Sequence, residues 1–209
     1  MDMKHLLADQ LEFYRDLGVT HLNLELPSLK SLESGIRACS LCEFSVDRRG
    51  VIAGWGSPQA DLMFVVDALS EEALQSGEPL AEEARELLHK IIRAIDLNPA
   101  DVFITNAVKC CPVDLRKPTA GEIEACRSWL IKQIGFVDPQ IIVPLGSTAA
   151  QCLLSTTEPI STLRGRIHYL GKYPVIPTFH PEYLLHNPKA KSEVWHDMKL
   201  VRDRLQKKS

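Results

Sequence analysis

The sequence lacks the features of a membrane-bound or exported protein. Its longest apolar runs, such as residues 141–145, are far shorter than the roughly 20 residues that a membrane-spanning helix requires. The amino terminus has no succession of charged, apolar and small residues of the kind found in secretory leaders. We therefore expect a cytoplasmic protein with no membrane partner.

Two catalytic signatures are also missing. The chain contains no glycine-rich phosphate loop and no Gly-x-Ser-x-Gly elbow. A zinc-containing α/β hydrolase or nucleotide-binding protein is therefore a weak alternative.

Composition favours one globular domain, because 209 residues of which 45% are hydrophobic can bury a sizeable core. The net charge of -3 conceals an asymmetry. Residues 164–209 hold ten Lys or Arg and four Asp or Glu, whereas residues 1–163 hold fourteen and twenty-three. A basic end on an acidic body suits a polyanionic partner, and a solvated terminal helix explains the charge equally well.

Six cysteines in a chain without an export signal indicate thiols that are reduced or bound to metal. Cys39 and Cys42 have the spacing of a metal knuckle, and Cys110 and Cys126 supply two further thiols. Four thiolates fit a zinc ion or a 4Fe-4S cluster. Structural zinc sites usually pair two knuckles, so the spread of the second pair over a loop and a helix favours iron and sulfur. Four buried, unligated cysteines are the remaining alternative.

Short apolar runs alternate with helical patterns along most of the chain. The apolar runs cover residues 62–66, 102–105, 141–145 and 175–179. The helical patterns cover residues 82–95, 119–134, 147–154 and 191–206. This alternation is typical of a parallel sheet covered on both faces. We predict an α/β fold of three αβα layers with a central, mainly parallel four-stranded sheet.

The first part of the chain is a predicted helical extension. Apolar residues at helical spacing indicate one helix over residues 1–17, which ends at Gly18, and a second over residues 28–37. We expect residues 1–38 to form this extension and residues 39–209 to form the main domain.

Polar residues follow the predicted strands. Asp67 follows the first strand, Asn106 the second, Gly146 the third and His180 the fourth. Ligands of open α/β sheets bind at the carboxyl ends of the strands, so a carboxylate, an amide and an imidazole are expected in one crevice. Turn formation alone also explains Asp, Asn and Gly at these places. His180 is the most informative, because Pro181 restricts its backbone.

Four stretches together resemble a known family, the iron-sulfur uracil-DNA glycosylases called family 4. These stretches are Cys39-x2-Cys42, residues 105–110 (Thr-Asn-Ala-Val-Lys-Cys) with Cys126, residues 163–165 (Leu-Arg-Gly), and residues 177–185 (Pro-Thr-Phe-His-Pro-Glu-Tyr-Leu-Leu). The resemblance covers most of the chain, from about residue 39 to residue 205. It implies a uracil-DNA glycosylase-like domain whose 4Fe-4S cluster is bound by Cys39, Cys42, Cys110 and Cys126.

The resemblance also implies roles for the polar residues. Asn106 would read the edge of a flipped uracil, and His180 would stabilise the leaving base as the glycosidic bond breaks. Asp67 would place the attacking water or stabilise a cationic sugar. The first motif, Gly-Glu-Ala-Pro-Gly in the family, reads Val-Asp-Ala-Leu-Ser here, and Leu80 replaces the phenylalanine on which uracil stacks. Ala68 and Leu80 are then expected beside the base.

A DNA-facing surface is implied as well. Pro181, Tyr183 and Leu184 would press into the duplex as a wedge. Three basic residues are the expected phosphate contacts: Arg164, Arg166 and Lys189.

The sequence therefore predicts a monomeric DNA glycosylase that hydrolyses the N-glycosidic bond of uracil or a related deaminated base in DNA. The alternative is a catalytically weakened iron-sulfur protein of the same fold that binds DNA, which the altered first motif favours.

Overall fold

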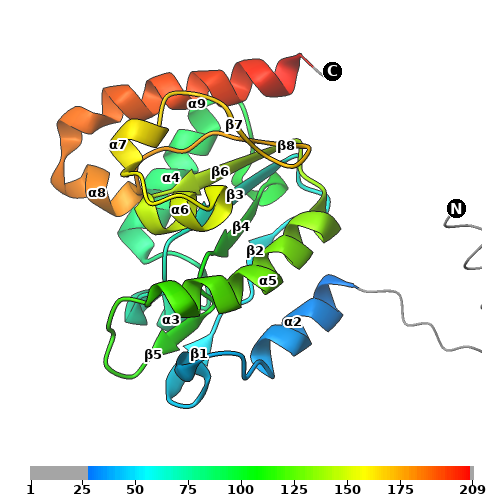
Figure 1. Ribbon diagram of the computed structural model, residues 1–209. Helices are drawn as coiled ribbons and strands as arrows, with labels where there is room; N and C mark the ends of the chain where they lie inside the picture. The colour runs from blue at the N-terminus through cyan, green and yellow to red at the C-terminus, as the bar shows by residue number, and fades with distance from the viewer. Residues whose placement is uncertain (1–27, 208–209) are drawn as a thin grey trace, which may run out of the picture.

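A six-stranded sheet forms the centre of the computed structural model, which describes residues 28–207 (Figure 1). Its strands lie in the order β2 (Trp55–Gly56), β4 (Phe103–Asn106), β3 (Leu62–Val66), β6 (Ile141–Leu145), β8 (Tyr173–Val175) and β7 (His168–Leu170). The four inner strands are parallel, as predicted. The two short edge strands are antiparallel and were not predicted.

Strand β3 is buried on both faces, which explains why its sequence is apolar throughout. Phe64 and its alternate neighbours pack against one helical layer, whereas Met63 and Val65 pack against the other. The register pairs Val66 with Asn106 on one side and with Leu145 on the other. The carboxyl ends of these three strands are therefore level.

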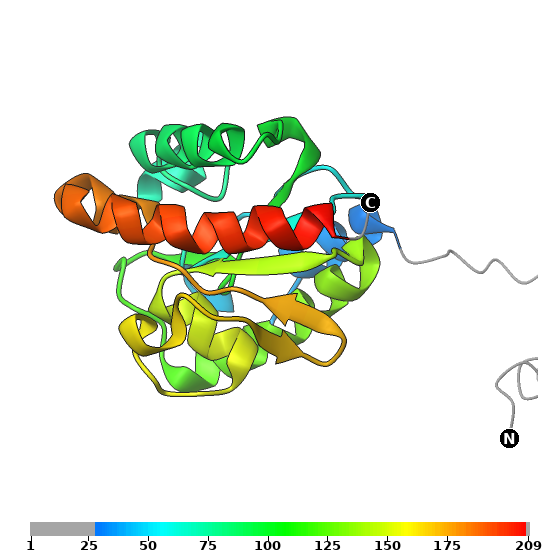
Figure 2. The same ribbon diagram turned by 90° about the horizontal axis from the view of Figure 1, so that it is seen from above.

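Helices cover both faces of the sheet, as the view from above shows (Figure 2). One layer consists of α4 (Glu82–Ala94), α8 (Pro181–His186) and α9 (Lys191–Gln206). The opposite layer contains α5 (Ala120–Val137) and α6 (Ser147–Leu154). The predicted three-layer αβα fold is confirmed.

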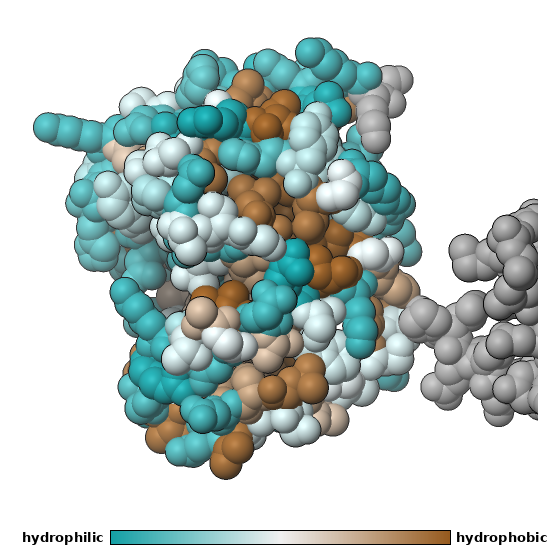
Figure 3. Space-filling model, in the orientation of Figure 1, coloured by the Kyte–Doolittle hydropathy of each residue, from teal (hydrophilic) through white to brown (hydrophobic). Residues whose placement is uncertain are grey.

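A small antiparallel ribbon lies at one end of the molecule, outside the central sheet. It pairs β1 (Arg48–Val51) with β5 (Cys110–Pro112), and the 3-10 turn η1 (Glu43–Ser45) lies beside it. Separate hydrophobic patches lie among hydrophilic surface at this end (Figure 3), and Leu41, Val46 and Val113, from the segments next to the ribbon, are exposed.

Local sequence signals fix several helix ends. Thr119 and Glu122 form a reciprocal capping box at the start of α5, as their spacing indicates. Three short helices were not predicted: α3 (Glu71–Ser76), α7 (Ile160–Leu163) and α8. The first begins at the cap of Ser70 and the third has proline at its first position.

The predicted second helix of the extension is present as α2 (Leu29–Arg37), which lies beside α5. A side chain at Gly35 would come within 2.6 Å of the Trp129 ring, so glycine permits this approach. The helix predicted over residues 1–17 lies outside the described residues, and the division at residue 38 stays a prediction. No helix in residues 28–207 is long and apolar enough to cross a membrane.

A buried carboxylate joins the last helix to the sheet. Asp197 of α9 is fully buried and accepts hydrogen bonds from the Thr178 hydroxyl at 2.6 Å and from Arg164 Nη2 at 2.8 Å. Arg164 also contacts Glu193, whose side chain is half exposed. These bonds fix the chain two residues before His180.

We expect the Asp197→Ala substitution to lower the free energy of unfolding by about 3 kcal/mol, because it leaves the Arg164 charge and the Thr178 hydroxyl without their buried partner. Glu193→Ala, which removes the exposed partner of the same arginine, should cost less than about 1 kcal/mol. Urea denaturation of both variants measures the difference. Equal losses would contradict a dominant role for the buried carboxylate.

Candidate active site

A cavity of about 720 Å³ lies at the carboxyl ends of the parallel strands, where the sequence places it. Its size is that of an ordinary small-ligand pocket. Asp67 and Gly146 line it directly after β3 and β6, and Tyr183 lines it from α8. The strand predicted over residues 175–179 requires a correction, because β8 ends at Val175 and His180 reaches the cavity as the cap of α8. The structure thus brings together two of the three polar side chains predicted to meet here.

The Asp67 carboxylate binds the beginning of α6. Its Oδ1 accepts a hydrogen bond from the Ala149 N–H at 2.7 Å, and the Thr148 backbone also hydrogen-bonds to it. A Cβ at Gly146 would lie 2.4 Å from Asp67 Oδ2, so only glycine leaves room for the carboxylate. Gly146 has φ +102°, a conformation that also favours glycine.

Burial raises the pKa of Asp67 to about 6, although the hydrogen bonds from Ala149 and Thr148 act in the opposite direction. Desolvation penalises the charged form more than these two donors stabilise it. Asp67 therefore titrates close to neutrality, which is the range that a general base requires.

His180 has a defined tautomer. Its Nδ1 accepts a hydrogen bond from the Glu182 N–H at 3.3 Å, so the proton of the neutral ring lies on Nε2. Burial lowers the pKa of His180, against a smaller opposing effect of the Glu182 carboxylate. The ring is thus neutral at pH 7, with one N–H free to donate.

An aromatic stack supports the His180 side of the cavity. The rings of Phe179 and Tyr183 lie 4.9 Å apart, and the Arg164 guanidinium lies 5.2 Å from the Phe179 ring centre. Because Arg164 also bonds Asp197 and Glu193, the stack joins the cavity wall to α9.

Asn106 does not line the cavity; it is fully buried beside it. Its Nδ2 donates to the Pro79 carbonyl at 3.1 Å, whereas its Oδ1 has no hydrogen-bond partner. Leu80 is also buried, and Ala68 lines the cavity wall. Among the described residues, three buried side-chain atoms have no hydrogen-bond partner, and Asn106 Oδ1 is the one beside this cavity, where water or a ligand can satisfy it.

Lys109 stabilises the backbone that carries Asn106, a role that the sequence did not predict. Its buried ammonium donates to Thr105 Oγ1 at 2.6 Å and to the Asn106 carbonyl. Burial lowers the pKa of Lys109 to about 8.

The four predicted ligand cysteines line one small cavity near the ribbon. Cys39 and Cys42 lie between α2 and η1, Cys110 begins β5, and Cys126 lies in α5. The rest of the lining is mostly apolar: Ile36, Leu41, Ser45, Val108, Lys109 and Trp129. Of the other two cysteines, Cys152 packs in the core, as predicted.

Three of these sulfurs accept N–H hydrogen bonds. Trp129 Nε1 donates to Cys39 Sγ at 3.2 Å, and Arg48 Nη1 donates to Cys110 Sγ at 3.4 Å. The Lys109 N–H lies 3.4 Å from Cys126 Sγ. Such bonds stabilise thiolates and tune iron-sulfur sites. Within residues 28–207, no three His, Cys, Asp or Glu side chains form a group suited to a single metal ion.

The predicted wedge requires a correction. Leu184 is 1% exposed and belongs to the core beneath α8, because the segment after Pro181 is helical and turns that side chain inward. Pro181 is buried at the helix start, and Tyr183, at 45% exposure, is the accessible member.

The three residues predicted to contact phosphates differ in exposure and in the hydrogen bonds that they already form. Arg164 is 14% exposed and its donors are engaged by acidic side chains. Arg166 donates to the Thr162 carbonyl at 2.8 Å on the exposed side of α7. Lys189 is exposed after α8. Arg166 and Lys189 therefore remain the two accessible candidates.

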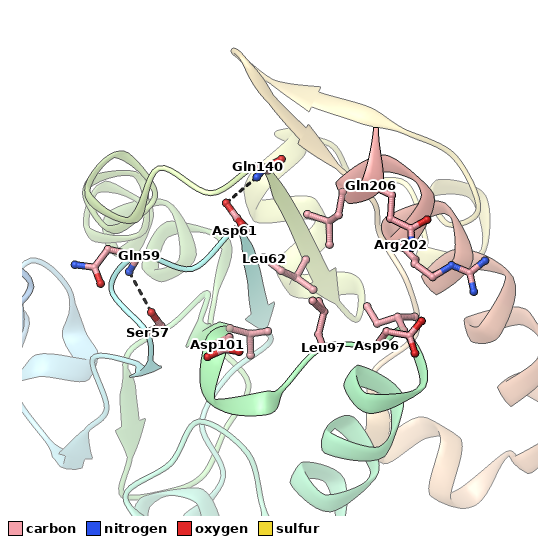
Figure 4. A pocket seen from close by; sticks show the side chains of 13 residues that line it. Ser57, Gln59, Asp61, Leu62, Asp96, Leu97, Asp101, Gln140, Arg202 and Gln206 are labelled. Atoms are coloured by element: carbon pink, nitrogen blue, oxygen red, sulfur yellow. Dashed lines mark hydrogen bonds between the residues drawn. The ribbon is translucent and has the colours of Figure 1, made fainter. Parts of the chain in front are cut away.

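A second cavity, of about 500 Å³, lies at the opposite end of the sheet (Figure 4). Asp61, Asp96, Asp101 and Arg202 surround an apolar floor there. It contains no histidine, and ligands of open α/β sheets bind at the other end. The Asp67 cavity is thus the candidate active site.

The fold and this edge of the sheet define an α/β protein with a strand-end ligand pocket. Residues 53–199 match the family described as the uracil DNA glycosylase superfamily, so the chain belongs to that superfamily.

Among its relatives are proteins named type-4 uracil-DNA glycosylase. That of Thermotoga maritima is 37% identical over 154 residues, which cover 73% of this chain and 80% of the relative. That of Sulfurisphaera tokodaii is 34% identical over 188 residues, 85% of each chain. That of Archaeoglobus fulgidus is 30% identical over 184 residues, 84% of this chain and 92% of the relative.

The raised pKa of Asp67 predicts a pH-dependent cost of folding. Since the folded state holds this proton up to about pH 6 and an unfolded Asp loses it near 3.8, the free energy of unfolding falls as the pH rises between these values. Asp67→Asn should therefore stabilise the protein above pH 6 by about 1 to 3 kcal/mol and change little at pH 4. Urea titrations at pH 4 and pH 8 measure this, and equal effects at both would contradict it.

Proposed function

We propose that this chain is a DNA glycosylase that excises uracil, or a related deaminated base, from DNA by hydrolysis of the N-glycosidic bond. The observation that carries the proposal is the Asp67–His180 cavity at the strand ends of a uracil DNA glycosylase fold. The names of the relatives support the choice of uracil.

His180 is the proposed electrophile. When the glycosidic bond breaks, negative charge develops on the base, and a neutral imidazole with its proton on Nε2 donates to it without losing that proton. The lowered pKa favours the neutral ring, and the Glu182 hydrogen bond to Nδ1 places its proton on Nε2.

Asn106 is the proposed reader of the base. Uracil presents a carbonyl and an imino N–H side by side, which an amide matches with one donor and one acceptor. The unpaired Oδ1 is available as the acceptor, and Nδ2, which donates one of its two hydrogens to the Pro79 carbonyl, has the other for the base. Because Asn106 is fully buried beside the cavity, its neighbours must move for the base to reach it.

Asp67 is the proposed base or electrostatic partner. Its Oδ1 is held by α6, so Oδ2 is the oxygen that would orient water or face a cationic sugar. The same hydrogen bond favours a second candidate function, a DNA-binding protein with weakened catalysis, because it holds the carboxylate against the helix rather than free in the cavity.

The cysteine cavity is the proposed site of a 4Fe-4S cluster. Four thiols and three N–H donors at sulfur fit such a group, and each thiolate of a cluster binds a different iron. Structural zinc sites usually pair two closely spaced knuckles, whereas Cys110 and Cys126 lie apart in β5 and α5, which favours iron and sulfur. The cluster would tie the Cys39 loop to α5 and to the turn that carries Asn106.

A uracil-containing single-stranded oligonucleotide, incubated with the cluster-loaded protein and treated with alkali, should be cleaved at the uracil. The rate should fall about tenfold per pH unit below pH 6, because Asp67 must be ionised. Asp67→Asn should lower the rate at least about a hundredfold and retain DNA binding. Asp101→Asn, at the opposite end of the sheet, is the matched control. Salt-sensitive binding without cleavage of uracil, hypoxanthine or xanthine would instead support the weakened protein.

Protein purified without oxygen should contain about four iron and four sulfide per chain and absorb broadly in the visible range. Cys126→Ser should lose much of this iron and melt at a lower temperature. Cys152→Ser removes a buried thiol outside the cysteine cavity and should keep its iron. Zinc without iron in the wild type would refute the cluster.

A further inference from the structure

We infer that Leu115 is a second wedge, which enters the DNA base stack from the side of the cavity opposite α8. The inference rests on the proposed action on DNA. Leu115 lies in the segment between β5 and α5, lines the active-site cavity and is 49% exposed. This segment and α8 lie on the same side of the molecule (Figure 1).

The backbone of Leu115 is unusual. Within residues 28–207, four residues other than glycine have positive φ: Asp96, Leu115, Asp138 and Ser155. The other three are small polar residues at helix ends, where this conformation is common. Leu115, with φ +54°, is a bulky residue outside any helix end. Strain of this kind persists where the surroundings impose it and clusters at ligand-binding sites.

The next residue anchors the backbone directly after Leu115. The Arg116 side chain, which is 36% exposed and also lines the cavity, forms a two-pronged ion pair with Glu122 at 2.6 and 2.8 Å and lies 4.3 Å from the Phe44 ring centre. Its N–H also donates to Asp114 Oδ1. With Arg116 tied to α5 through Glu122, the exposed Leu115 side chain is held at the cavity rim.

Both partners of Arg116, Phe44 and Glu122, lie close in sequence to cysteines of the cysteine cavity. Phe44 follows Cys42 by two residues and packs in one buried cluster with Val108 and Cys110. Glu122 lies one helical turn before Cys126. The position of Leu115 therefore depends on the segments that carry the four cysteines, which gives the proposed cluster a way to act on DNA binding.

The side chains at this rim of the cavity have the chemistry needed to enter a DNA base step. An apolar side chain that protrudes between bases unstacks them, and a neighbouring cation binds the adjacent phosphate. Lys117 is exposed two residues after Leu115 and lines the same cavity. Tyr183 occupies the other side, so two protruding side chains would hold the gap that a flipped base leaves.

Two measurements test the wedge. The first is the fluorescence of 2-aminopurine beside a tetrahydrofuran abasic analogue in duplex DNA, which rises when the base step opens and requires no turnover. The second is the ratio of uracil excision from duplex to that from single-stranded DNA. Leu115→Ala should abolish most of the fluorescence rise and lower duplex excision about tenfold, with single-strand excision within about twofold of the wild type.

Two further variants separate the wedge from folding and from general hydrophobicity. Leu115→Asn removes the apolar tip but suits a left-handed backbone, so it should melt no lower than the wild type and still lose the rise. Val113→Ala shortens an exposed apolar side chain in the same segment that does not line the cavity, and should change neither measurement.

The outcomes distinguish this inference from the proposed function. A Leu115-dependent fluorescence rise without excision in the wild type would refute the glycosylase and support the wedge. Excision with a wild-type response in Leu115→Ala would refute the wedge and leave the glycosylase intact. A wild type that gives neither signal refutes both.

Discussion

The parallel pairing of β3 with a strand on each side is the constraint on which the site depends. Because Val66 is level with both Asn106 and Leu145, the residues that follow three strands emerge together at one edge. Backbone hydrogen bonds and a core buried on both faces set this arrangement. Substitutions in the segment after β3 therefore alter the chemistry of the pocket while the pocket itself remains in place.

The parts of the fold that follow from periodicity were predictable. Strands β3 and β6 and helices α6 and α9 begin and end where their patterns indicate. The edge strands and the ribbon were missed, because two- to four-residue strands carry no periodic signal and exist through pairing with a partner distant in sequence. The segment after Pro181 is predicted from the sequence to act as a wedge that includes Leu184. Its proline at the first helical position was the signal that would have placed Leu184 in the core.

The sequence predicts which end of the sheet carries the candidate site, but it does not predict the contacts that its side chains make. Asp67 reaches the cavity because it directly follows β3, and His180 reaches it as the cap of α8, which the predicted strand over residues 175–179 did not indicate. The side-chain contact of Asn106 depends on the distant Pro79 carbonyl. The Gly146-Ser147 pair indicates the start of a helix, whose first N–H groups need acceptors. The pair does not indicate that Asp67 is the acceptor. The contacts of Lys109 and Arg48 could not be predicted, because most Lys and Arg side chains are exposed and nothing in the sequence near these two indicates otherwise.

The contact between Gly146 and Asp67 couples the two positions physically. A methyl group at position 146 would displace the carboxylate, and a longer acid at position 67 would have to find another path to the Ala149 N–H. Substitutions at the two positions are therefore expected to be non-additive, and libraries that vary this pocket should randomise both together.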